Sequence, residues 1–165
     1  IGVLALTMGV STSWAQKIGF INSEMIFTEY EGTKAAQAKF NKEVEKWEAE
    51  ASKQQKEIKD LKEQLDKQSL LLSNDRKKEM EDSLNQKMVN YQKFLQDKFG
   101  QKGEALTKNE ELTKPIIEKI NKIIEKIAKD ENYDYIFDAR AGGVIFAKED
   151  YNLSKRVLAE LGKEK

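Results

Sequence analysis

The stretch FNKEVEKWEAEASKQQKEIKDLKEQLDKQSLLL, residues 40–72, carries apolar side chains at alternating steps of four and three residues. These steps lead through Phe40, Val44, Trp47, Ala51, Gln54, Ile58, Leu61, Leu65, Gln68 and Leu72. Eight of the ten positions are apolar, and a 3.5-residue repeat over more than four heptads is typical of a left-handed coiled coil. We therefore expect a long helix whose apolar stripe, called the seam below, packs against a partner helix. Gln54 and Gln68 interrupt the seam and bury less apolar surface than leucine would, so the packing is expected to be loose there.

A second helix is predicted after a short turn. Ser73, Asn74 and Asp75 favour caps and turns because their side chains bond to nearby backbone amides. Apolar spacing then resumes and thins toward the single proline, with Met80, Leu84, Met88, Tyr91, Leu95, Phe99, Leu106 and Leu112 before Pro115. The segments 35–72 and 75–114 are almost equal in length, which predicts an antiparallel helical hairpin (residues 35–114) with its tip near residues 70–76.

Three adjacent leucines stand at this predicted tip. They cannot share one narrow helical stripe, because neighbouring residues point about 100° apart. Either they close the core of the hairpin or some of them face outward and bind a partner. Methionines further along favour the second role because their side chains adapt to irregular apolar partners, although ordinary core packing is the alternative for them too. The candidate binding residues of the hairpin are Leu70, Leu71, Leu72, Met80, Leu84 and Met88.

Gly100 and Gly103 lie inside the predicted return leg. Each lowers helix propensity by about 1 kcal/mol relative to alanine. Two interpretations stay open: a joint that lets the hairpin bend around guests of different size, or a weak spot that the helix tolerates.

Short strands are predicted on either side of the hairpin, in a body made of residues 16–34 and 115–165. The segment KIGFIN (17–22) is typical of a strand buried on both faces. The segment YDYIFDARAGGVIFAK (133–148) predicts two more strands, joined by a loop with Gly142 and Gly143. An isoleucine-rich helix after Pro115 is expected to pack on the strands, and an amphipathic helix capped by Ser154 closes the chain. The fold class is therefore α+β.

The size of this body predicts self-association. About seventy residues form a small core, and three short strands leave two unpaired edges with apolar side chains on both faces. We therefore expect several copies to share their strands. The residue pattern does not fix the number of copies.

Composition excludes several kinds of chemistry. The 165 residues include 29 basic and 29 acidic side chains and no cysteine or histidine. Thiol chemistry, the usual zinc sites and histidine general bases are therefore excluded, and the zero net charge gives no pull toward nucleic acid. Asp134 and Asp138 could be imagined as an acid–base pair, but charges that discourage stray edge pairing of a strand explain them better. We expect no enzyme, no catalytic residue, no metal and no cofactor.

The first residues read as a targeting segment. The apolar run IGVLALTMGV is followed by Ser13-Trp14-Ala15, a small-x-small cleavage signal. Residues 1–15 are therefore interpreted as the remnant of a secretory signal peptide, with a buried helix as the alternative. A secreted chain without cysteine suggests the bacterial periplasm.

The succession of segments resembles the Skp/OmpH family of periplasmic chaperones. The resemblance rests on KIGFIN followed by SEMIFTEY, a hairpin with LSNDRKKEMEDSL at its turn, YDYIFDARAGGVIFAKEDYNLS and a final RVLAEL, and it spans roughly residues 17–161. It implies a homotrimer whose pooled strands form a barrel, and hairpins that enclose a cavity for unfolded outer-membrane proteins. The trimer body would be built by Ile18, Phe20, Ile21, Ile136, Phe137, Val144, Ile145 and Phe146.

One departure from the family bears on its ligands. The best-studied kind of member is strongly basic, whereas this chain is neutral, which argues against a lipopolysaccharide site. We expect the protein to be close to the membrane only indirectly. The chain has no GxxxxGK segment, so the resemblance implies an ATP-independent holdase. A structural coiled-coil scaffold of the cell envelope is the alternative function.

Overall fold

The computed structural model describes residues 16–163, so the expected signal-peptide remnant (1–15) lies outside the described residues. The elements follow in the order β1 (Ile18–Ile21), α1 (Ser23–Glu29), α2 (Glu31–Gln68), α3 (Asn74–Phe99), α4 (Glu104–Asp130), β2 (Tyr135–Asp138), the 3-10 helices η1 (Ala139–Ala141) and η2 (Glu149–Tyr151), and α5 (Ser154–Lys163). Two compact units result. The hairpin unit comprises residues 28–119, and of the described residues 16–27 and 120–163 belong to the sheet unit.

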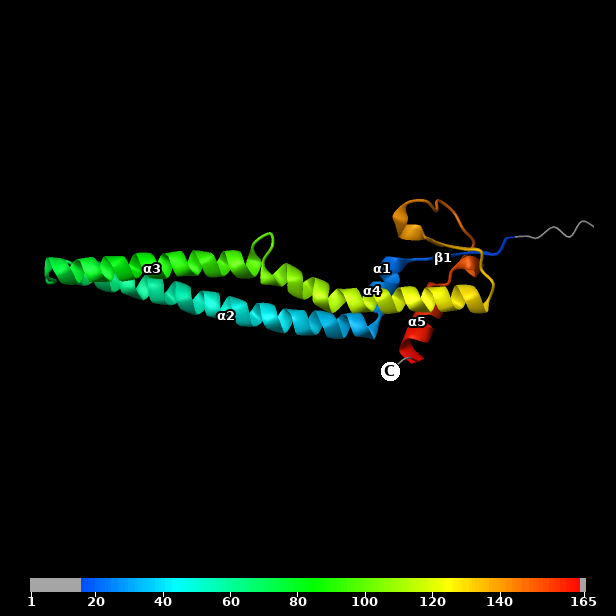
Figure 1. The fold of residues 1–165 in the computed structure, drawn as a ribbon, viewed down its shortest axis with the longest axis horizontal. Helices are drawn as coiled ribbons and strands as arrows, with labels where there is room; N and C mark the ends of the chain where they lie inside the picture. The colour runs from blue at the N-terminus through cyan, green and yellow to red at the C-terminus, as the bar shows by residue number, and fades with distance from the viewer. Residues whose placement is uncertain (1–15, 164–165) are drawn as a thin grey trace, which may run out of the picture. The chain divides into compact units, whose positions relative to one another are not determined.

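In the hairpin unit, α2 and α3 run side by side and are joined by a short turn at residues 69–73 (Figure 1). Ser73 is the N-cap of α3, and its Oγ accepts a hydrogen bond from the backbone N–H of Arg76 at 3.3 Å. This bond satisfies one of the amides that a helix leaves unpaired at its start. The predicted helical hairpin is confirmed.

The heptad positions of α2 form its shielded face. Of the ten positions stepped from Phe40 to Leu72, only Gln68 is exposed, and Ala51 and Leu65 are the most deeply buried. On α3 most shielded residues also follow alternating steps of three and four, namely Lys77, Met80, Leu84, Lys87, Tyr91, Phe94 and Lys98, and Leu95 beside Phe94 is half-buried as well. The regular spacing places Lys87 on the shielded face in place of the predicted Met88.

The return leg is interrupted by four residues. Helix α3 ends at Phe99 and α4 begins at Glu104, and Figure 1 shows residues 100–103 as a loop that leaves the line of the two helices. The helix was expected to end before Pro115, but α4 continues through this residue to Asp130. Proline removes one backbone donor, and the neighbouring turns, with Ile116 and Ile120 buried, are sufficient to keep the helix intact.

The sheet unit contains two parallel strands. In the β1–β2 register, Ile18 lies opposite Tyr135 and Phe20 lies opposite Phe137. Within one chain Gly19 and Ile21 are buried, whereas Ile18 is exposed and Phe20 is half-buried, so a single chain buries only one face of this strand. The buried core of the unit consists of Ile21, Ile26, Ile120, Ile123, Ile127, Leu153, Ser154, Val157 and Leu161.

The third predicted strand does not form in the described chain. Residues 144–147 have no regular structure, although Gly142 makes the expected turn with a left-handed φ of 82°. A strand needs a hydrogen-bonding neighbour, and β1 is already flanked by β2 on one edge and by a parallel bridge from Phe20 to Asn152. The α+β class is confirmed with a two-stranded sheet instead of three strands.

Candidate functional site

The tip of the hairpin exposes two large apolar side chains. Leu70 is 96% exposed and Leu71 is 87% exposed, whereas Leu72 is half-buried. The backbone N–H groups of Leu71 and Leu72 both donate to the carbonyl oxygen of Gln68, at 2.8 and 3.1 Å. This tight turn ends the seam and turns the first two leucines outward, so they add little to the core of the hairpin.

The other candidate binding residues lie on α3 in two different environments. Met80 and Leu84 are half-buried on the shielded face, while Met88 is 44% exposed. Beside it, Val89 is 59% exposed, and sequence reasoning missed this residue because it followed the apolar residues at helical spacing from Met80. An apolar pair next to a polar seam position was the signal that could have revealed it.

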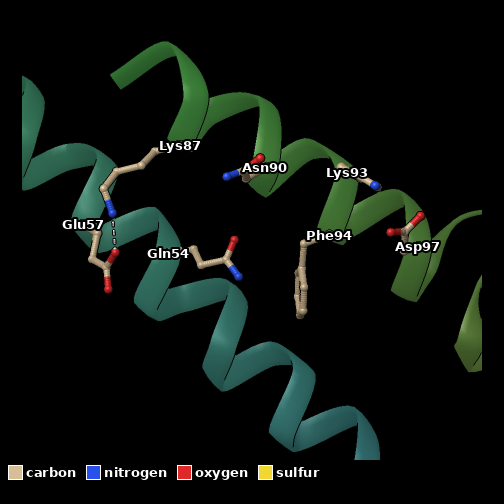
Figure 2. Close-up of a pocket in the computed structure, with 7 residues that line it drawn as sticks. All are labelled: Gln54, Glu57, Lys87, Asn90, Lys93, Phe94 and Asp97. Carbon is tan, nitrogen blue, oxygen red and sulfur yellow. Dashed lines mark hydrogen bonds and ion pairs between the residues drawn. The ribbon is translucent and has the colours of Figure 1, made fainter. Parts of the chain in front are cut away.

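A polar gap interrupts the seam in the middle of the hairpin (Figure 2). Its volume is about 420 Å³, and its walls are formed by Gln54, Glu57, Lys87, Asn90, Lys93, Phe94 and Asp97. In Figure 2 the Phe94 ring points from α3 into the space between the helices, and the Gln54 amide approaches from α2. The predicted loosening of the seam at Gln54 coincides with this gap.

An ion pair closes one end of the polar gap. Lys87 Nζ lies 2.7 Å from Glu57 Oε2, as the dashed line in Figure 2 indicates. The hydrogen bond from Lys87, together with its positive charge, lowers the pKa of Glu57 below its usual value of 4.5. Both side chains keep contact with water, so the pair adds more to alignment of the helices than to stability.

The sheet unit presents a continuous apolar face. Ile18, Phe20, Tyr135 and Phe137 share one side of the two strands, and the Tyr135 and Phe137 rings stack at 6.0 Å between centroids. Tyr135 was missed at the sequence level, although its two-residue spacing from Phe137 was the signal that could have revealed it. On the opposite side of the strands, Ile136 is half-buried beside the buried Ile21.

The segment that was expected to form the third strand lines a groove with this face. Val144 is half-buried, whereas Ile145 is 99% exposed and Phe146 is 85% exposed. The groove has a volume of about 700 Å³, and Ile18, Phe20, Phe137, Tyr151 and residues 143–148 are among its walls. Such an apolar surface is unusual in a soluble monomer and is typical of an interface.

The two strand-end carboxylates are occupied by structural hydrogen bonds. Asp134 Oδ2 accepts from the backbone N–H of Lys17 at 2.7 Å, and Asp138 Oδ1 accepts from the N–H groups of Ser23 and Arg140 at 3.2 and 3.1 Å. Partial burial opposes ionisation of Asp138, but these bonds prevail and lower its pKa. Both groups therefore tie the ends of the strands to neighbouring backbone.

Residues 16–163 lack two features that would suggest other functions. In that part of the chain, helices long and apolar enough for a membrane span are absent. The same residues contain no cluster of three or more acidic side chains arranged to hold a metal ion.

Comparison with known proteins identifies the family. The sequence profile of the outer membrane protein (OmpH-like) family matches residues 17–161. Among solved structures, an OmpH-like outer membrane chaperone from Caulobacter crescentus CB15 has a TM-score of 0.82 at 15% sequence identity, over 96% of this chain and 90% of its own. No curated protein matches the sequence significantly. Because the profile covers most of the chain and the solved structure has the same fold, this protein belongs to the OmpH-like outer membrane protein family.

Proposed function

We propose that this protein is an ATP-independent holdase chaperone of the periplasm that binds unfolded outer-membrane proteins and prevents their aggregation. The clients are held in a cavity between the helical hairpins of several copies. Membership of the OmpH-like family supports a chaperone role.

The observation that carries the proposal is the exposure of Leu70 and Leu71 at the hairpin tip. Exposure of apolar side chains to water is unfavourable in free energy, and these two add little to the core. Contact with an unfolded chain would remove their apolar surface from water. Unfolded barrel strands expose alternating apolar residues and unpaired backbone, so they match such a surface. Contacts from several hairpins add through effective concentration, so weak individual contacts give firm capture.

A homotrimer is the second part of the proposal. The apolar face of the sheet and the exposed Ile145 and Phe146 need a cover, and the free edge of β2 needs a strand. A second copy of the same chain supplies both, because its residues 144–147 are outside the two-stranded sheet of their own chain and can add to the β2 edge of a neighbour. The number three comes from the family resemblance.

The decisive experiment measures the mass of the protein by light scattering, alone and after addition of a urea-diluted outer-membrane barrel protein without nucleotide. A mass of three chains that increases by one soluble client supports the proposal. A single-chain or filamentous mass with a precipitated client contradicts it and favours a structural coiled-coil scaffold of the envelope.

Matched variants separate capture from assembly. Leu70→Ser with Leu71→Ser is expected to weaken client capture at unchanged oligomer mass, while Leu106→Ser on α4 serves as the control for loss of an exposed leucine away from the tip. Ile145→Asp with Phe146→Asp is expected to dissociate the oligomer, and Ala141→Asp, an exposed residue in the same connection, should leave it intact.

A further inference from the structure

The four residues between α3 and α4 interrupt a helical leg whose heptad pattern does not stop. Alternating steps along α3 end with Phe94 and Lys98, and the same steps lead on to Gln101, Ala105, Lys108 and Leu112. Ala105, Lys108 and Leu112 are half-buried on α4, as seam positions should be. The sequence pattern is therefore that of one continuous helix from α3 into α4.

The observed loop is compatible with the same seam. Four residues are close to one helical turn of 3.6 residues, so removing them from the helix rotates α4 by only about 40°. The shielded face of the leg stays directed toward α2 whether the four residues are inside the helix or outside it. Two registers that differ by one turn are thus both compatible with the apolar pattern.

Two glycines permit the looped-out form. A Cβ built on Gly100 would collide with the carbonyl oxygen of Gln96, and one on Gly103 would lie 2.7 Å from the carbonyl oxygen of Lys98. Neither glycine has a positive φ, so backbone conformation does not require glycine at these positions. Glycine is required because a carbonyl oxygen lies where the Cβ of another residue would be. In a continuous helix an alanine fits at both positions and is the better helix former.

Contacts at the base of the loop hold this form closed. Lys98 Nζ forms an ion pair with Glu104 Oε1 at 2.5 Å and lies 5.5 Å from the centroid of the Trp47 ring on α2. The backbone N–H of Gly103 donates to the carbonyl oxygen of Gly100 at 2.9 Å. In a continuous helix Lys98 and Glu104 would be six residues apart and on different faces, so the ion pair belongs to the looped-out form alone.

We propose that residues 100–103 are a reserve helical turn: the return leg can take them into the helix, and α4 then shifts along α2, relative to α3, by about one turn. The shift is about 6 Å, because each of the four residues adds about 1.5 Å of rise. One-turn shifts of packed helices are a known kind of conformational switch. This inference does not depend on the proposed chaperone function.

Spin-label distances in the full-length protein test the proposal directly. The chain has no cysteine, so Gln92→Cys and Glu110→Cys, both at exposed helical positions, introduce the only two labels. The backbone separation is about 21 Å with the four residues looped out and about 27 Å with them in the helix. The expected result is the shorter distance in the parent protein and the longer one after Gly100→Ala with Gly103→Ala.

Control variants make each outcome informative. Deletion of residues 100–103 should leave a folded protein with the shorter distance, and Gly162→Ala, whose Cβ would meet nothing within 4 Å, should change neither distance. The proposal is overturned if the double alanine variant keeps the shorter distance or loses its helical circular dichroism signal. It is equally overturned if the deletion variant does not fold.

Discussion

Lys87 Nζ on α3 lies 2.7 Å from Glu57 Oε2 on α2, and this ion pair joins two helices across thirty positions of sequence. Lys87 occupies a seam position that the heptad pattern reserves for an apolar residue. A polar residue at such a position costs stability but aligns the partner helices, because other registers would leave the lysine without its carboxylate. The pair therefore fixes the register of α3 on α2 beside the polar gap.

Glu57→Gln should destabilise the hairpin at neutral pH and lose this effect in acid. The pKa of Glu57 is lowered in the folded protein, so its contribution to stability is full above the unfolded value of about 4.5 and disappears as the pH falls through the folded value. Thermal unfolding at several pH values checks this: the difference in Tm between parent and variant should shrink below pH 4.5.

A matched control for this titration is Glu63→Gln. The ion pairs of Glu63 with Lys59 and Lys67 stay within α2, so its loss leaves the alignment of the two helices unchanged. An equal effect of both substitutions at every pH would contradict a special role for the pair between α2 and α3.

Gln54→Leu should stabilise the hairpin by about 1 kcal/mol. Gln54 is half-buried in the polar gap, and its amide donates to Glu50 of the same helix, so leucine adds apolar burial and the hydrogen bond that is lost lies within α2. Urea unfolding measures the change. Gln68→Leu is the control, because Gln68 is exposed and its replacement should alter the free energy of unfolding by less than about 0.5 kcal/mol.

Truncation of two leucines near the tip should cost very different amounts of stability. Leu65→Ala removes a buried seam residue and should cost about 2–4 kcal/mol, whereas Leu71→Ala should cost less than about 0.5 kcal/mol because that side chain is already in water. Equal losses in urea unfolding would mean that Leu71 is covered in solution and belongs to the core.

The sequence predicted the hairpin well because its evidence is local. The apolar spacing over ten heptad positions predicted the first helix, and the capping residue Ser73 predicted where the second helix begins. Met88 was assigned to the seam because apolar residues were counted, whereas the lysine aliphatic stem can occupy a half-buried position with its charge in water. The continuation of α4 through Pro115 was missed since packing outweighs a single lost hydrogen bond.

The sheet was harder to predict because strand pairing joins distant segments. Ile18 and Tyr135 are 117 positions apart, and nothing local specifies that their strands run parallel. Residues 144–147 have the composition of a strand, but composition cannot supply the neighbour that a strand needs. Ser154 was expected as the N-cap of the last helix; instead it is the first helical residue, and its Oγ accepts from the N–H of Asn22 at 2.8 Å.

Gly19→Ala should destabilise the sheet unit by about 1–3 kcal/mol. A Cβ at this position would lie 2.7 Å from Cδ1 of Leu153, and Leu153 is buried in the core, so the leucine cannot move aside without disturbing its neighbours. Gly143→Ala is the matched control, since its Cβ would meet nothing within 4 Å. Urea unfolding of both variants checks the difference. Equal stability of the two would indicate that Leu153 adopts another rotamer, and that the buried face of β1 is less tightly packed than the close approach of Gly19 and Leu153 implies.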